Sequence, residues 1–249
     1  MNIVLLESHE ILGQTVHLEG RRAQHIVKVL RSHPGDEIRV GCINGKIGYG
    51  VIIETNPLQP YSVAMEISLE HSPEPPPQID IVLALPRPIM FKRILCHAAA
   101  LGVGSLYVVN ASRVEKSFWD ASVIQEIFYR KHLVRGLEQA GDTRLPSVTF
   151  HKGFKPFVES TLPGITTGYR NLLFAHPGNQ SSLSEIFSKQ PGRTLLAIGP
   201  EGGWIDYELT RMQEAGFSIF SIGPRILDVE TAVTALHSMV SLLASNTKN

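Results

Sequence analysis

The chain has 249 residues, 43% of them hydrophobic, which suits one α/β domain or a large domain carrying a smaller one. Lysine plus arginine equals aspartate plus glutamate, at 23 each, so no overall basic charge indicates a nucleic-acid partner, and any such surface must be local. The two cysteines indicate neither a disulfide framework nor a metal site, and without a basic leader or a long apolar run we expect a soluble, cytoplasmic protein.

The first 71 residues predict a small β-barrel with one helix. Apolar side chains recur at helical spacing over residues 21–30, and Pro34-Gly35-Asp36 forms a turn after them. Three strands are predicted at residues 37–42, 48–55 and 61–69, the first two joined by the turn signal Asn44-Gly45.

Basic residues gather in two segments. Residues 21–31 contain four cations and no acid, and residues 87–144 contain nine basic and five acidic side chains. Such patches can neutralise several phosphates, although each alone also fits an ordinary solvated helix face.

A proline-rich linker at residues 72–78 separates this region from one of a different pattern, because consecutive prolines neither continue a helix nor donate to a sheet. Beyond it, apolar runs alternate with helical patterns, which predicts an α/β domain over residues 79–249 with buried parallel strands. The predicted strands are residues 79–85, 105–109, 171–175, 194–198 and 217–222. The predicted helices are residues 90–101, 122–139, one starting at Asp206, and a final helix with an apolar stripe from Val229 to Leu243.

Two of these strands run into similar loops, each followed by a helix. The first loop reads Gly199-Pro200-Glu201-Gly202-Gly203, and the second begins Gly223-Pro224-Arg225-Ile226-Leu227. Ligands of parallel sheets bind at such carboxyl ends, and glycines let a ligand approach the backbone closely. Neither loop has the phosphate-binding pattern of a Walker A motif or of G-x-G-x-x-G, which disfavours a nucleotide or nicotinamide enzyme.

Together, the two loops and the segment His25-Ile26-Val27-Lys28-Val29-Leu30-Arg31 resemble the RsmE family of ribosomal RNA small-subunit methyltransferases. The resemblance implies a SPOUT-type fold whose C-terminus threads a trefoil knot, a PUA-like barrel that binds RNA, and a homodimer whose pocket adjoins the partner subunit. It also implies S-adenosylmethionine as the cofactor and N3 of a uridine in 16S ribosomal RNA as the target. No ligand-spaced cluster of His, Cys or acidic residues suggests a metal.

The two loops and the basic segment at residues 21–31, read with this resemblance, predict two binding sites. The residues expected to bind the cofactor are Ala175, His176, Ile198, Gly199, Pro200, Glu201, Gly202, Gly203, Ile222, Gly223, Ile226, Leu227, Thr231 and Ala232. The residues expected to bind RNA are Arg21, Arg22, His25, Lys28 and Arg31.

Methylation of uridine N3 requires removal of a proton and stabilisation of the resulting anion. Arg113, which follows a predicted strand, is the candidate for stabilising that anion or for contacting a phosphate, and an ordinary surface role is the alternative. Glu201, Asp228 and Glu230 are candidates for proton removal, although Glu230 also suits the first turn of a helix.

Three departures from the family pattern favour an alternative function. Asp228 stands where the family usually has arginine, and residues 96–102 and 138–142 also differ from it. The alternatives are therefore an RNA-binding assembly factor that has lost catalysis, or a methyltransferase with a different RNA target.

Overall fold

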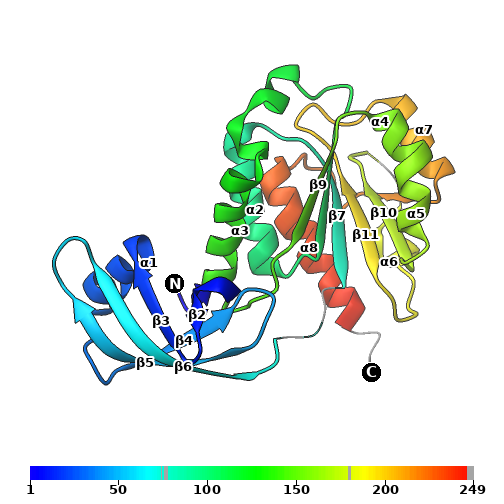
Figure 1. Cartoon of the computed structure of the whole chain (residues 1–249). Coiled ribbons are helices and arrows are strands. Elements are labelled where there is room, and N and C mark those ends of the chain that lie inside the picture. The colour runs from blue at the N-terminus through cyan, green and yellow to red at the C-terminus, as the bar shows by residue number, and fades with distance from the viewer. Residues whose placement is uncertain (74, 76–77, 179–180, 246–249) are drawn as a thin grey trace. The chain divides into compact units, whose positions relative to one another are not determined.

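The computed structural model describes residues 1–73, 75, 78–178 and 181–245, and the chain divides into two compact units. The first unit comprises Met1–Pro75 and Val134–Leu145, and the second comprises Pro76–Leu133 and Pro146–Asn249. Figure 1 shows the first unit mainly in blue and cyan and the second from green to red. Residues 74, 76 and 77 of the predicted linker lie outside the described residues.

A curled six-stranded sheet forms the body of the first unit, in the order β1-β4-β5-β6-β3-β2 (Figure 1). Its strands are β1 (Val4–Leu6), β2 (Ile11–Leu12), β3 (Thr15–Glu19), β4 (Glu37–Cys42), β5 (Ile47–Asn56) and β6 (Ser62–His71). β1 pairs with β4 in parallel, and the other pairs are antiparallel. The three strands predicted from sequence are confirmed, whereas β1, β2 and β3 were not predicted.

The predicted helix of this unit is present, but its second half is a π-helix instead of an α-helix. α1 (Gly20–His25) is α-helical, and Ile26–Leu30 continues it as a π-helix that ends at Arg31 with a φ of 56°. Ala23 and Ile26 are fully buried in an apolar cluster with Leu18 and Met65. The apolar residues at helical spacing therefore pack into the core beneath the sheet.

The first unit is discontinuous in sequence because Val134–Leu145 packs with it, whereas the sequence predicts that this segment belongs to the second domain. The backbone N–H of Asn2 donates to the carbonyl of Glu138 at 2.7 Å, and that of Asn44 donates to the carbonyl of Thr143 at 2.7 Å. Helix α3 (Glu126–Ala140) therefore begins in the second unit and ends in the first.

A fully parallel six-stranded sheet, in the order β12-β10-β11-β7-β8-β9, forms the centre of the second unit. Its strands are β7 (Ile79–Ala84), β8 (Ser105–Val109), β9 (Ser147–His151), β10 (Asn171–Ala175), β11 (Thr194–Ile198) and β12 (Ser218–Phe220). Every residue of β7 and β11 is buried, which explains why both strands are apolar apart from Asp80 and Thr194. The predicted parallel strands are confirmed, and β9 is an additional edge strand.

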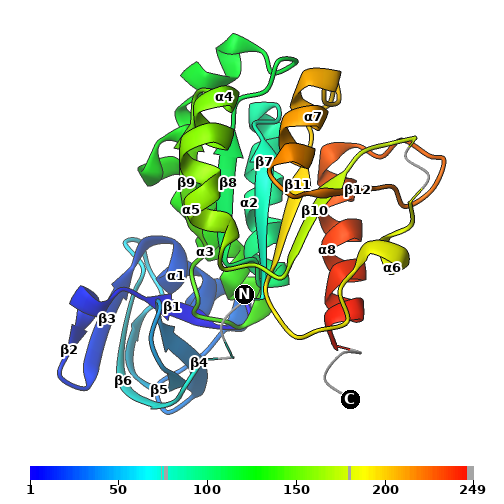
Figure 2. The same ribbon diagram turned by 90° about the vertical axis from the view of Figure 1, so that its right-hand side faces the viewer.

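Helices cover both faces of this sheet. α2 and α8 lie on one face, while α4, α5 and α7 lie on the other, as Figures 1 and 2 show from two directions. The helices are α2 (Pro88–Leu101), α4 (Phe154–Pro156), α5 (Leu162–Thr166), α6 (Leu183–Ile186), α7 (Asp206–Glu214) and α8 (Val229–Ser245). Short 3-10 turns (Lys116–Asp120 and Ser122–Ile124) precede α3, and a π-helical segment (Phe157–Thr161) joins α4 to α5.

One charged side chain lies within the buried sheet. Asp80 of β7 is fully buried and accepts a hydrogen bond from the backbone N–H of Ser105 at 2.7 Å. Arg193 and the hydroxyl of Tyr169 also bind its carboxylate. These partners satisfy the charge near the start of β7, remote from the carboxyl ends of the strands.

Candidate active site

A cavity of about 390 Å³ lies where β10, β11 and β12 end, within the size range of small-molecule sites. Two loops form its walls, residues 199–204 after β11 and residues 221–227 after β12. Apolar side chains from strand ends and from α8 contribute to its lining, namely Ala175, Ile198, Phe220, Val229, Ala232 and Leu236. The cavity therefore combines an apolar lining with two exposed backbone loops.

The first loop is shaped by close packing on a tryptophan. A Cβ atom placed on Gly199 would lie 2.7 Å from Nε1 of Trp204, so only glycine fits there. Trp204 is buried, with its ring 5.1 Å from that of Phe174 between centroids. Gly203 adopts a φ of +73° and donates its N–H to the carbonyl of Pro200 at 2.8 Å, which closes the turn.

Glu201 fastens this loop to the start of α2. Its Oε1 accepts a hydrogen bond from the backbone N–H of Arg87 at 3.0 Å, and Arg87 is the N-cap of the helix. An anion at a helix N-terminus is stabilised by the helix dipole. Glu201 lines the cavity, so it remains available to a ligand there.

Arg113 lies against the same loop. Its Nη1 donates to the carbonyl oxygen of Gly202 at 2.6 Å, and a Cβ on Gly202 would lie 3.0 Å from the Cβ of Arg113. Arg113 lines the cavity together with Glu201.

Glu208 supports this arrangement and was not predicted from sequence. It is 2% exposed, and its two carboxylate oxygens accept from the backbone N–H groups of Ser112 at 2.7 Å and Ile205 at 3.0 Å. It thereby joins the segment that carries Arg113 to the start of α7. In the sequence, Glu208 can be recognised only as an acid in the first turn of a predicted helix. That position does not reveal its contact with Ser112.

The second loop ends in a helix cap. Asp228 accepts a hydrogen bond from the backbone N–H of Thr231 at 2.7 Å, the geometry of an N-cap for α8. This backbone hydrogen bond holds the pKa of Asp228 below its ordinary value. Ile226 lines the cavity and is 83% exposed, whereas neither Asp228 nor Thr231 lines it.

Two further candidate residues differ in their relation to the cavity. His176 lines it, and burial lowers the pKa of its imidazole, which favours the neutral ring near pH 7. Glu230 does not line it and instead pairs with Arg93 at 3.4 Å and His97 at 3.7 Å on α2. The third carboxylate candidate is therefore a helix contact.

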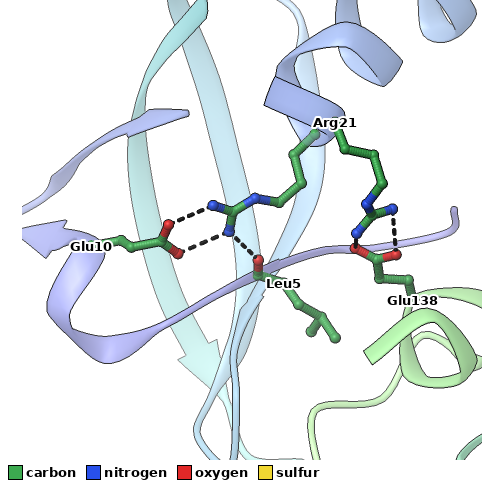
Figure 3. Close-up of polar contacts among 5 residues, drawn as sticks. Leu5, Glu10, Arg21 and Glu138 are labelled. Carbon is green, nitrogen blue, oxygen red and sulfur yellow. Dashed lines mark hydrogen bonds and ion pairs between the residues drawn. The ribbon is translucent and has the colours of Figure 1, made fainter. Parts of the chain in front are cut away.

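In the first unit, two of the predicted RNA-binding arginines are held by carboxylates. Figure 3 shows Arg21 facing Glu138, and the two nitrogens of its guanidinium lie 2.9 and 2.7 Å from the carboxylate oxygens. Arg22 pairs with Glu10 and donates to the carbonyl of Leu5 at 2.7 Å. The charges of both arginines are thus balanced within the unit.

The other three predicted RNA-binding residues have different environments. Lys28 lies over the ring of Tyr61, 5.5 Å from its centroid, and Arg31 is exposed. His25 is partly buried, and burial lowers its pKa. Lys28 and Arg31 are therefore the members of the set best able to meet a phosphate.

Among the residues that the structure describes, no group of three or more His, Cys, Asp or Glu side chains is arranged to hold a metal ion. No helix in the described part of the chain is both long and apolar enough to cross a membrane.

Comparisons with known proteins agree on a family. Residues 73–241 match the model of the RNA methyltransferase domain, and residues 18–62 match that of the RNA methyltransferase PUA domain. The chain is 31% identical to Ribosomal RNA small subunit methyltransferase E of Treponema pallidum (strain Nichols), over 96% of this chain and 90% of the relative.

The chain is also 24% identical to Ribosomal RNA small subunit methyltransferase E 1 of Borreliella burgdorferi, over 94% of this chain and 95% of the relative. The fold is similar to a structure of Ribosomal RNA small subunit methyltransferase E from Neisseria gonorrhoeae bound to S-adenosyl methionine, with a TM-score of 0.79. That match has 23% identity and covers 98% of both chains. By its domain model and its Treponema relative, the chain belongs to the RsmE family of ribosomal RNA small subunit methyltransferases.

Proposed function

We propose that the protein is a cytoplasmic, S-adenosylmethionine-dependent methyltransferase that acts on N3 of a uridine in 16S ribosomal RNA of the small subunit. The observation that carries this proposal is the cavity walled by the two glycine-containing loops after β11 and β12. Membership of the RsmE family supports the reaction, and the resemblance noted in the sequence supports the choice of N3.

The cavity fits a cofactor that has an apolar body and hydrogen-bonding edges. Gly199 lines the cavity and has no side chain, so a ligand there can approach its backbone closely. The Nδ1 of His176 is buried and has no hydrogen-bond partner among the described residues, which suits a ligand contact. We assign cofactor binding to the predicted residues that line the cavity, and we leave Thr231 out because its backbone is used by the Asp228 cap.

When bound, the cofactor supplies a methyl group activated by a sulfonium. Of the three candidate carboxylates for proton removal, Glu201 lines the cavity. Asp228 instead caps α8, and Glu230 pairs with Arg93. We therefore assign to Glu201 the acceptance of the N3 proton. Arg113 lies beside it with a guanidinium that stabilises the resulting anion.

The finer features of the fold and assembly are also proposals. We assign the parallel sheet of the second unit to a SPOUT fold with a C-terminal trefoil knot, and the curled sheet of the first unit to a PUA-like barrel. We assign a homodimer because a second groove of about 430 Å³, lined by Met239, Leu242 and Leu243, shares Ile222 and Gly223 with the cavity. Leu242 in this groove is 63% exposed, as suits a residue that a second copy covers.

The alternative of a binding factor without catalysis rests on the departures from the family pattern, above all Asp228. The capping role of Asp228 weakens this argument, because the carboxylate is used outside the cavity lining. A different RNA target remains the stronger alternative, since the departures at residues 96–102 and 138–142 also lie outside that lining.

The test is to incubate the purified protein with labelled S-adenosylmethionine and small ribosomal subunits that lack the modification. The RNA is then digested, and the labelled nucleoside is identified. We expect label in 3-methyluridine. Cofactor binding without any transfer would instead support the binding factor, and label in another nucleoside would support a different target.

A further inference from the structure

Strand β5 carries a row of exposed apolar side chains. Tyr49, Val51 and Ile53 are 48%, 44% and 53% exposed, and they alternate with the buried Gly50 and Ile52. Because side chains alternate across a strand, the three lie on the face of the sheet opposite the apolar cluster that contains Ile52. Large apolar residues that stand in a row on a solvent face indicate a contact surface.

Acidic side chains flank this row. Val51 pairs with Glu37 of β4 on one side and with Glu66 of β6 on the other, and both glutamates are exposed. Side chains of directly paired residues lie about 5 Å apart at Cβ, so both carboxylates border the row. A register shift between Ile52 and Glu54 pairs Glu54 with Ala64 of β6, two residues from Glu66, and thereby brings this exposed acid to the same face.

One cation of the sheet stands on the same face. Arg39 pairs with Tyr49 across β4 and β5, and its Nη2 donates to the carbonyl of Gly141 at 3.2 Å. The face thus carries three carboxylates and one guanidinium, and that guanidinium already donates to a backbone carbonyl. A surface of this sign repels the phosphates of RNA and attracts a cationic partner.

The position of β5 also decides how a partner can bind. β5 pairs with β4 along one edge and with β6 along the other, so neither edge can accept an added strand. A partner must therefore bind through side chains, with apolar groups on the row and lysine or arginine beside the glutamates.

We propose that the β5 face, defined by Glu37, Tyr49, Val51, Ile53 and Glu66, docks a basic, partly apolar protein segment of the ribonucleoprotein substrate. This inference rests on the proposed function, because it takes the small subunit as the substrate. It assigns to the first unit a protein contact, in addition to the RNA contact expected from Lys28 and Arg31.

The first test places a photo-crosslinking phenylalanine derivative at Val51 in the full chain and irradiates it with purified small subunits. A second variant, with the same derivative at Val29, is the control for binding, because Val29 is 65% exposed and lies between Lys28 and Arg31, outside the cavity lining. We expect the Val51 adduct on a ribosomal protein of positive net charge and the Val29 adduct on RNA. A Val51 adduct on RNA, or no Val51 adduct while the Val29 adduct forms, would overturn the proposed contact at the β5 face. The absence of methyl transfer to small subunits by the wild type would instead count against the proposed function itself.

The second test reverses the flanking charges. For the Glu37→Lys/Glu66→Lys variant we expect KM for small subunits to rise about ten-fold or more, with kcat and cofactor affinity unchanged. Glu19→Lys, an exposed carboxylate on β3 of the same sheet, is the matched control and should leave KM unchanged. An RNA contact at this face predicts the opposite sign, a lower KM for the double variant. That result, or an unchanged KM, would overturn the proposal.

Discussion

The guanidinium of Arg113 donates a hydrogen bond to the carbonyl oxygen of Gly202 at 2.6 Å, so a residue that follows β8 is fixed to the loop that follows β11. A Cβ on Gly202 would lie 3.0 Å from the Cβ of Arg113, so a side chain there would crowd this contact. One wall of the cavity is therefore a contact between two segments about ninety residues apart in the sequence. Its cation is held at the cavity before any ligand arrives.

Replacing Arg113 by alanine should lower kcat by about 100-fold, because the developing anion loses a preorganised donor. Arg113→Lys should recover part of this loss, since the charge remains but the planar donor geometry does not. Single-turnover methylation of small subunits measures the rate, and calorimetry measures cofactor affinity. A fall in cofactor affinity that accounts for the whole loss of rate would contradict a role in the reaction.

Gly199→Ala should weaken cofactor binding by about ten-fold or more, because the new methyl group must displace the indole of Trp204. The shift of the indole should also change tryptophan fluorescence. Gly164→Ala is the matched control, since a Cβ at that position meets nothing within 4 Å. Equal affinities of the two variants would show that the loop tolerates a side chain.

Asp228→Ala should lower the free energy of unfolding by about 1 kcal/mol through loss of the α8 cap, whereas Asp228→Asn should be nearly neutral. Both variants should keep methyl transfer activity, because Asp228 does not line the cavity. Urea unfolding and the methylation assay measure the two effects. Loss of activity in a stable Asp228→Asn protein would return this residue to the catalytic candidates.

The cap also predicts a pH dependence. The pKa of Asp228 is held below its ordinary value of 3.8 by the hydrogen bond from Thr231, so its charged form stabilises the folded protein. This contribution is fully present above the ordinary value and is lost as the pH falls through the lower, folded value. The stability difference between the wild type and Asp228→Ala should therefore shrink in acid. A difference that is unchanged under these acidic conditions would exclude a charged cap.

Arg21→Ala should destabilise the first unit by about 1–3 kcal/mol, because it leaves the carboxylate of Glu138, 4% exposed, without its bidentate partner (Figure 3). Cofactor affinity should not change, since every residue that lines the cavity belongs to the second unit. Arg31→Ala, an exposed cation nearby in sequence, should keep stability and weaken RNA binding. Unfolding curves and filter binding separate these outcomes, and equal stability of the two variants would contradict the expected cost.

Leu242→Glu should shift the protein toward monomers if the groove on α8 is a dimer contact, because a carboxylate would be buried in an apolar interface. Sedimentation velocity measures the change. Thr234→Glu, an exposed position on the same helix, is the control. A monomeric wild type, or a Leu242→Glu protein that sediments as a dimer, would remove the support for this assembly.

The sequence predicted the sheet of the second unit because its signals are local. Apolar runs such as residues 194–198 mark buried strands, and the glycines after them mark the turns that form the cavity walls. The strands β1 to β3 were missed because they are short or follow one another closely, so alternation has little length in which to appear.

Long-range partners are what the sequence could not supply. Arg21 lies in a basic cluster that resembles a phosphate site, yet its partner Glu138 is 117 positions away. Asp228 was a candidate base because it adjoins a motif, and its role as a cap depends on the direction in which the carboxylate turns. The motifs of the sequence thus indicate where the cavity lies. They do not show which charged side chains are paired with other residues of the protein.

The discontinuity of the first unit has a consequence for biosynthesis. Its sheet is complete in sequence by His71, but Glu138 and the rest of Val134–Leu145 emerge from the ribosome only after β7, α2 and β8 have been made. Until then Arg21 cannot pair with Glu138, and the nascent first unit lacks the segment Val134–Leu145 that packs with it. We therefore expect its protection from proteases during translation to rise in two steps, the second after residue 145 has left the tunnel.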